Sequence, residues 1–206
     1  MIEAKHREPE RCPWVGIADP EYARYHDEEW GVPLADDRAL FEKLVLEGFQ
    51  AGLSWLTILR KRDNFRRAFH NFDAQRIARF TDNDVARLMQ DTGIVRNRLK
   101  IEATIDNARA YLALQKRQSL AKFMWHIARN EKPAKASPPR AFSDVPAESE
   151  ASRRLSKALK AEGFRFVGPT TLYALMQSAG MVNDHLVSCH RRSKCAALQK
   201  DFSLPN

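Results

Sequence analysis

The segment LEGFQAGLSW, residues 46–55, contains a carboxylate in apolar company. Glu47 follows the apolar face of an expected helix and precedes two glycines and Trp55. Burying an ionised carboxylate costs several kcal/mol unless a partner compensates. The residue is therefore either a helix-terminal carboxylate paired with a nearby arginine or a group that faces a binding pocket, and its apolar neighbours favour the pocket.

A second set of residues has the chemistry of a metal centre. His185 and Cys189 are four residues apart, and on a helix that spacing puts both side chains on one face. Cys12 and His26 supply another sulfur and another nitrogen near the N-terminus. Two cysteines and two histidines form a closed tetrahedral set for zinc, which would tie the two ends of the chain together.

Other readings of these residues remain open. The three cysteines of the chain are too few, and too odd in number, for a disulfide framework. His185 also fits a core histidine, and the cysteines fit buried thiols. In addition, His190 and Cys195 are rival ligands in the same C-terminal tail.

The segment 163–169 is typical of a short turn between two helices. Gly168 and Pro169 open the second helix, so the nearby backbone amides have no intrahelical acceptors. These amides belong to Val167, Gly168, Thr170 and Thr171. Such a helix N-terminus can hold a DNA phosphate without reading sequence. An ordinary helical hairpin is the alternative, and three basic flanking residues favour phosphate binding: Lys157, Lys160 and Arg165.

The elements that must position these groups are expected to be helices. Asp36 or Asp37 can cap a helix that ends near Gly48, and Ser54 can cap the helix after it. The sequence TDND at residues 81–84 is a capping-box pattern that starts a further helix.

Helical periodicity continues over residues 97–115, 120–128, 152–163 and 169–180. Between them, residues 130–148 contain four prolines and are expected to form a connector. No stretch shows the sustained alternation of a strand. The sequence therefore predicts an all-α fold, with residues 1–206 forming a single globular domain of two packed helical lobes.

Composition limits the classes of partner. A net charge of +8 favours a polyanionic partner, most often nucleic acid, although a solvated basic surface would give the same balance. No apolar run approaches the roughly 20 residues of a membrane span, and the N-terminus lacks the apolar centre of a signal peptide. We therefore expect a cytoplasmic protein with no membrane partner.

Six segments carry a resemblance to a known family. RCPWV, DPEYARYHDEEWGVP, LEGFQAGLSW, GIVRNRLKI, GFRFVGPTT and VNDHLVSC occur in this order between Arg11 and Cys189. Together they resemble the DNA-3-methyladenine glycosylase I family of helix-hairpin-helix DNA glycosylases. The resemblance implies that residues 163–170 form the hairpin. It also implies one structural zinc ion, with ligands that match Cys12, His26, His185 and Cys189. His190 and Cys195 fall outside this match and are expected at the surface.

The resemblance also implies roles for the residues of the pocket. Glu47 matches the residue that recognises the base, and Tyr25 and Trp55 match aromatic residues that flank the extruded base. Trp14 and Trp30 are expected to line the pocket further, with core packing as the alternative. Gly48 and Gly52 are expected to leave room for the base, and the implied substrate is 3-methyladenine in alkylated double-stranded DNA.

The implied reaction is hydrolysis by a monofunctional enzyme that acts as a monomer. Related glycosylases carry a catalytic aspartate where Asn183 stands here, and those that also cut the strand carry a lysine where Thr170 stands. Asp184 is a candidate for activating the attacking water. Two other functions remain to be distinguished: a non-catalytic, zinc-stabilised DNA-binding protein, and a zinc hydrolase, which would need an open coordination position.

Overall fold

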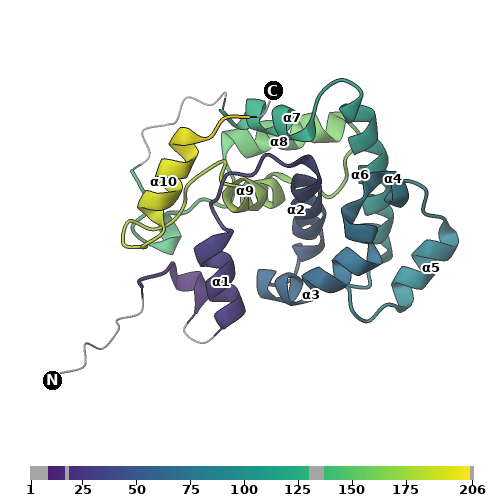
Figure 1. Cartoon of the computed structure of the whole chain (residues 1–206), viewed down its shortest axis with the longest axis horizontal. Helices are drawn as coiled ribbons and strands as arrows, with labels where there is room; N and C mark the ends of the chain where they lie inside the picture. The colour runs from purple at the N-terminus through teal and green to yellow at the C-terminus, as the bar shows by residue number, and fades with distance from the viewer. Residues whose placement is uncertain (1–8, 17–18, 130–136, 205–206) are drawn as a thin grey trace.

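Helices make up all the regular secondary structure that the described residues contain, which confirms the predicted all-α class (Figure 1). The computed structural model describes residues 9–16, 19–129 and 137–204. Residues 130–136 of the expected connector lie outside these ranges. The α-helices are α1 (Pro20–Glu28), α2 (Asp37–Gln50), α3 (Trp55–Ala68), α4 (Ala74–Ile77), α5 (Asp82–Gln90), α6 (Arg98–Gln115), α7 (Leu120–Arg129), α8 (Glu150–Ala161), α9 (Pro169–Ser178) and α10 (Arg192–Asp201). Short 3-10 turns are η1 (Pro13–Val15), η2 (His70–Phe72) and η3 (Phe142–Asp144). None of the helices in these ranges is long and apolar enough to cross a membrane.

Helix α2 runs through the middle of the molecule. It packs against α3, α6, α7 and α9, and Figure 1 shows it beside α9. A helix surrounded by other helices is apolar around most of its circumference, and a continuous run of α2, residues 44–49, is buried. Glu47 belongs to that run, so the packing of α2 carries its carboxylate into the protein interior.

The helix starts follow the local capping chemistry of the sequence. The Asp36 side chain accepts a hydrogen bond from the backbone amide of Ala39 at 2.8 Å, so Asp36, not Asp37, caps α2. Ser54 caps α3 in the same way, and residues 81–84 form the expected capping box of α5. These predictions are confirmed, because a cap depends only on residues within one turn of each other.

Helix α2 ends at Gln50, two residues beyond Gly48 and close to the predicted end. Gly48 faces the turn before α9, where an added Cβ would lie at ordinary contact distance, 3.4 Å from Cβ of Phe166. Gly52 follows in an exposed turn with φ +85°. Neither glycine is among the residues that line the cavity described below, so the prediction that they leave room for a ligand is wrong.

The turn between α8 and α9 is fixed by side chains from neighbouring helices. Asn107 of α6 accepts a hydrogen bond from the Arg165 amide at 2.7 Å and donates one to the Arg165 carbonyl at 3.1 Å. Ser156 donates to the Val167 carbonyl at 2.6 Å. Pro169 occupies the first turn of α9, as predicted. The start of α9 is therefore held rigidly against the core.

Candidate functional site

Four side chains from the two ends of the chain meet in one buried cluster. Cys12, His26, His185 and Cys189 are all buried, and one possible ligand atom from each lies within 4.8 Å of the others. Cys189 Sγ lies 3.4 Å from His26 Nε2 and 3.4 Å from His185 Nδ1. A hydrogen bond from Cys12 lowers the pKa of Cys189, which favours the thiolate that metal binding requires. The cluster can hold a metal ion.

The local geometry of His185 and Cys189 differs from the prediction. They do not lie on a helix, because α9 ends at Ser178 and the chain forms an irregular loop until α10 begins at Arg192. A turn in this loop brings the two side chains together at the same four-residue spacing. Helical periodicity was therefore the wrong reason for a grouping that the structure does contain.

Hydrogen bonds on the outer side of each histidine orient its ring. Asp27 Oδ1 lies 2.8 Å from His26 Nδ1, and Arg11 and His190 bind the same carboxylate. His185 Nε2 lies 3.2 Å from the backbone oxygen of Trp30. These contacts point His26 Nε2 and His185 Nδ1 into the cluster, as the outer hydrogen bonds of metal-binding histidines commonly do.

Cys195 is not a surface residue, so that prediction is wrong. Its side chain is 0% exposed, and its sulfur lies 3.4 Å from His185 Nε2, on the side away from the cluster. Gly31 packs at the same place with φ +82°, and an added Cβ would lie 2.8 Å from His185 Nε2. His190 is exposed as expected, but it is bound to Asp27. Cys195 and Gly31 thus form the wall behind His185.

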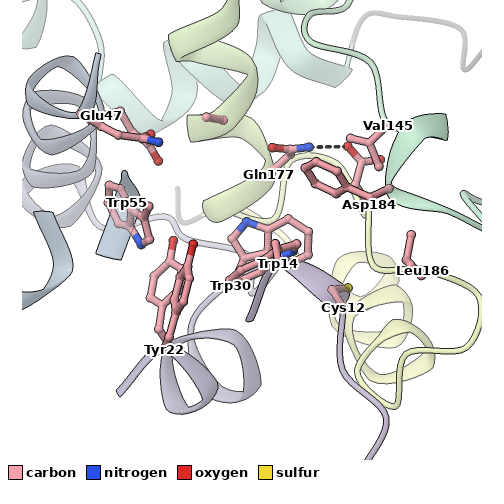
Figure 2. Close-up of a pocket in the computed structure, with 14 residues that line it drawn as sticks. Cys12, Trp14, Tyr22, Trp30, Glu47, Trp55, Val145, Gln177, Asp184 and Leu186 are labelled. Carbon is pink, nitrogen blue, oxygen red and sulfur yellow. Dashed lines mark hydrogen bonds between the residues drawn. The ribbon is translucent and has the colours of Figure 1, made fainter. Parts of the chain in front are cut away.

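A cavity of about 210 Å³ lies next to this cluster, with room for much more than a single water molecule. Figure 2 shows Glu47 and Trp55 on one side of it and Gln177 and Asp184 on the opposite side. Cys12, one of the four cluster residues, also contributes to the lining. The cavity and the possible metal centre therefore share a wall.

Glu47 is buried in this cavity and is 4% exposed. Ser178 of α9 donates a hydrogen bond to Glu47 Oε1 at 3.2 Å. Among the described residues, no arginine lies within ion-pair distance of Glu47, so the helix-terminal ion pair considered from the sequence is absent there. Burial raises the pKa of Glu47 to about 7, opposed by the nearby ammonium of Lys43 and by the Ser178 hydrogen bond. The carboxylate is therefore poorly compensated while the cavity is empty.

Aromatic rings form the rest of the wall around Glu47. Tyr25 and Trp55 line the cavity with their ring centroids 5.5 Å apart, and Trp14 and Trp30 line it with centroids 5.1 Å apart. Trp30 is also nearly buried and contacts the His185 ring at 4.5 Å. Both alternatives for Trp30 thus hold, because it packs in the interior with one face and borders the cavity with another.

Several residues at the cavity were not predicted from the sequence. Tyr22 lies three residues before Tyr25 in the same helix, so the helical spacing of the two tyrosines could have indicated it. Ser178, which does not line the cavity but donates a hydrogen bond to Glu47, was expected only as part of an apolar helix. Phe142, which is 59% exposed, lies in the segment treated as a connector. Long-range folding brings Ser178 to Glu47 and Phe142 to the cavity, and no local pattern indicates either contact.

Asp184 faces the cavity and not the metal ligands. Its Oδ2 accepts hydrogen bonds from the Tyr173 hydroxyl at 2.7 Å and from Gln177 Nε2 at 2.8 Å. The Gln177 bond is the dashed line in Figure 2. The carboxylate is therefore held in place on the side of the cavity opposite Glu47.

The start of α9 has backbone amides without acceptors among the described residues; Gly168, Thr170 and Thr171 are partly or fully exposed, whereas Val167 is buried. Within the described part of the chain, no hydrogen-bond acceptor is present for the amides of Val167, Gly168, Thr170 and Thr171. A Cβ added at Gly168 would meet nothing within 4 Å, so the space in front of this helix end is open. Arg165 is exposed beside it and is bound to Asp106 at 2.6 Å. An anion can reach these amides.

The described part of the chain is all-helical and buries a carboxylate among aromatic rings. Proteins with such a cavity can bind a flat, positively charged ligand. The family model described as methyladenine glycosylase matches residues 14–192. The chain is 50% identical to DNA-3-methyladenine glycosylase 1 of Escherichia coli (strain K12) over 181 residues, which cover 87% of this chain and 95% of that protein. The chain therefore belongs to the methyladenine glycosylase family.

Solved structures agree with this assignment. A crystal structure of 3-methyladenine DNA glycosylase I superimposes with a TM-score of 0.83 at 49% identity, covering 88% of this chain and 98% of that one. A second structure, of a point variant of such an enzyme in complex with 3-methyladenine, gives a TM-score of 0.81 at 40% identity, with 88% and 97% coverage.

Proposed function

We propose that this protein hydrolyses the glycosidic bond of 3-methyladenine in alkylated double-stranded DNA and leaves an abasic site. The observation that supports this function most strongly is the Glu47 carboxylate, buried in an aromatic cavity without an arginine partner among the described residues. A related enzyme has been crystallised with 3-methyladenine, and its fold matches this one.

The chemistry of the lesion explains why such a cavity selects it. 3-Methyladenine in DNA carries a positive charge that is spread over the purine, whereas adenine is neutral. A buried carboxylate attracts the cation and accepts a hydrogen bond from its exocyclic amine, and aromatic rings add cation–π attraction. Adenine leaves the carboxylate uncompensated, so the normal base is bound more weakly.

In this proposal each side of the cavity has its own role. Glu47 recognises the base, Tyr25 and Trp55 flank it, and Trp14 and Trp30 complete the aromatic wall. The cationic base is already a good leaving group, so the reaction needs no strong general acid. Water attacks the sugar as the bond breaks, and Asp184, held by Tyr173 and Gln177, is the candidate to orient that water.

The turn before α9 would hold the DNA backbone. We assign it as the hairpin of a helix-hairpin-helix motif, in which the backbone amides of Val167, Gly168, Thr170 and Thr171 donate hydrogen bonds to a phosphate and Arg165 adds positive charge. Because Arg165 is bound to Asp106 in the free protein, it would exchange that partner for a phosphate on binding. Extruding the base costs a few kcal/mol, and stacking on the aromatic wall offsets this cost.

A negative charge at the start of α9 should weaken DNA binding. Thr170 is exposed next to the free amides, so Thr170→Glu would repel the phosphate that they hold. We expect the affinity for undamaged duplex to fall about tenfold, equally for all sequences. The measurement is fluorescence anisotropy with labelled duplexes, and Thr92→Glu, which makes the same change at another exposed threonine, is the control. Equal affinities of the two variants would contradict this assignment.

The metal ion in the Cys/His cluster is proposed to be one zinc ion with a structural role. Two sulfur and two nitrogen donors fill a tetrahedral site, which leaves no open position for a zinc hydrolase. We further propose that the chain acts as a monomer and that its two helical lobes form a single domain.

The direct test is chromatography of the bases that purified protein releases from methylated DNA. We expect free 3-methyladenine and abasic sites without strand cleavage. Borohydride should trap no covalent adduct, because Thr170 supplies no amine. A non-catalytic DNA-binding protein would bind the same DNA and release nothing, and an adduct trapped by borohydride would refute the hydrolytic mechanism.

The activity should depend on pH through Glu47. Its pKa of about 7 in the empty cavity means that below this pH the carboxyl is protonated and loses its attraction for the cationic base. We expect kcat/KM for base release to fall about tenfold for each pH unit below the midpoint and to level off above it. A profile of Glu47→Gln measured in parallel should lack this acid limb. A wild-type profile that is flat between about pH 5 and 8 would contradict the prediction.

A further inference from the structure

A positive charge of the protein lies one helical turn from Glu47. Lys43 and Glu47 are at positions i and i+4 of α2, so their side chains share a face of the helix. Lys43 Nζ lies 5.5 Å from the centre of the Tyr25 ring, and Tyr25 lines the cavity that holds Glu47. Lys43 itself lines a separate hollow, with Trp55 as the shared wall. The ammonium therefore lies close to the recognition cavity but outside it.

The acidic neighbours of Lys43 are already bound to other cations. Both oxygens of Glu29 accept hydrogen bonds from Arg62, at 2.5 and 2.9 Å. Glu42 accepts one from Arg66 at 2.9 Å. Among the described residues, no carboxylate lies within ion-pair distance of Lys43. Glu47 is the nearby carboxylate that no arginine neutralises.

We propose that Lys43 is a specificity-determining residue. Its ammonium group lies behind Tyr25 and supplies the positive charge of the protein that favours the ionised Glu47 carboxylate until a cationic base enters. This inference rests on the proposed function and adds a residue to it. The other groups that face Glu47 are Tyr22 and Tyr25 from α1 and Ser178 from α9. Lys43 is therefore the cation among the charged and titratable groups that surround this carboxylate.

The positive charge of Lys43 has two opposite effects on binding in the cavity. In the empty cavity it stabilises the ionised form of Glu47, as its lowering of the Glu47 pKa indicates. Once a cationic base lies between the aromatic rings, Lys43 repels it and weakens its attraction to the Tyr25 ring. Lys43 thus increases the ionised fraction of Glu47 at neutral pH. It also limits how tightly a cation, including the released base, can bind in the cavity.

The first test follows the ionisation of Glu47 without DNA. In protein labelled with ¹³C-glutamate, the Glu47 carboxyl signal is identified by its absence in Glu47→Gln, and its NMR titration midpoint is compared between wild type and Lys43→Met. We expect the midpoint to rise by about 1 pH unit. Lys43→Gln gives a second neutral variant if methionine disturbs folding. Lys122→Met, at an exposed position on α7, should leave the midpoint unchanged. A midpoint that stays the same or falls in both Lys43 variants overturns the proposal.

The second test measures repulsion directly. 3,9-Dimethyladeninium is a permanently cationic purine. Because burial lowers the pKa of Lys43, binding is measured at about pH 8, where Lys43 keeps more of its charge than at higher pH, and each affinity is corrected for the ionised fraction of Glu47 from the NMR titration. Calorimetric titration should then give several-fold tighter binding to Lys43→Met than to wild type, while Lys122→Met should match wild type. Equal or weaker binding to Lys43→Met overturns the proposal. If the wild-type protein released no 3-methyladenine, the proposed function would fail, yet the NMR titration would still decide the role of Lys43.

Discussion

Glu47→Gln is expected to reduce the release of 3-methyladenine from alkylated DNA by about 10²–10³-fold. Glutamine keeps the size of the side chain and its hydrogen-bond acceptor but removes the negative charge. The lost term is the attraction between a buried carboxylate and a cation, which the low dielectric of the cavity makes large. The measurement is kcat/KM for base release at about pH 8, where the wild-type carboxylate is ionised.

The same substitution should make the folded protein more stable. The pKa of Glu47 is raised from 4.5 to about 7 in the folded state, so the ionised form is disfavoured there. The contribution of Glu47 to the stability of the wild type is therefore most favourable below about pH 4.5 and is lost as the pH rises through about 7, by up to about 3 kcal/mol. Glu47→Gln lacks this loss, so thermal unfolding should show it more stable at about pH 8, with the difference closing towards about pH 4.5.

A matched control separates charge in the cavity from charge elsewhere. Glu102 lies on α6 and is bound to Arg98 at 3.5 Å, away from the cavity. Glu102→Gln should retain full activity and should not become more stable at high pH. If Glu47→Gln were as active as this control, the role of Glu47 in recognition would be wrong, whatever its effect on stability.

Loss of the metal centre should have the second-largest effect. Cys189→Ala removes a ligand that lies 3.4 Å from both His26 and His185, so we expect the zinc content to fall from one ion per chain to none. The four residues of the cluster join the segment before α1 and α1 itself to the loop before α10, and losing a metal link between them should cost several kcal/mol. For a chain of this size this corresponds to a fall of about 10 °C or more in Tm.

Cys195→Ala is the control for this prediction. Cys195 is equally buried and also touches His185, but on the nitrogen that faces away from the cluster. This variant should keep its zinc and most of its stability. Metal analysis and thermal unfolding, with and without a chelator, distinguish the variants. A Cys189→Ala protein that retained zinc, or that lost zinc without losing stability, would contradict the structural role.

Local chemistry in the sequence was enough to predict most helix starts. Caps such as Ser54 and the Thr81–Asp84 box depend on residues three apart, and the structure contains them as expected. The end of α2 was predicted to within two residues, because Gly48 is a common sign of termination but does not itself fix the last turn of the helix.

The parts of the candidate site that could be predicted are residues whose polarity or metal-binding chemistry differs from that of their neighbours in the sequence. A carboxylate within an apolar segment indicated a cavity, and two Cys/His pairs indicated a cluster, although the helical geometry assumed for His185 and Cys189 is wrong. Ser178 could not be identified, because nothing in its own segment points to Glu47, whereas the i, i+4 spacing of Lys43 and Glu47 within one predicted helix could have indicated Lys43. Cys195 was misplaced because its burial depends on its packing against His185 and on the close approach of Gly31.

Gly31 connects the two halves of the site. It directly follows Trp30, which borders the cavity, and its missing side chain leaves space for the outer nitrogen of His185. Any larger residue would have to adopt a positive φ and would also press on His185. In a saturation mutagenesis library selected for survival under alkylation stress, codon 31 should therefore tolerate almost no substitution. A buried backbone position behind His185 would then rank with Glu47 in its sensitivity to substitution.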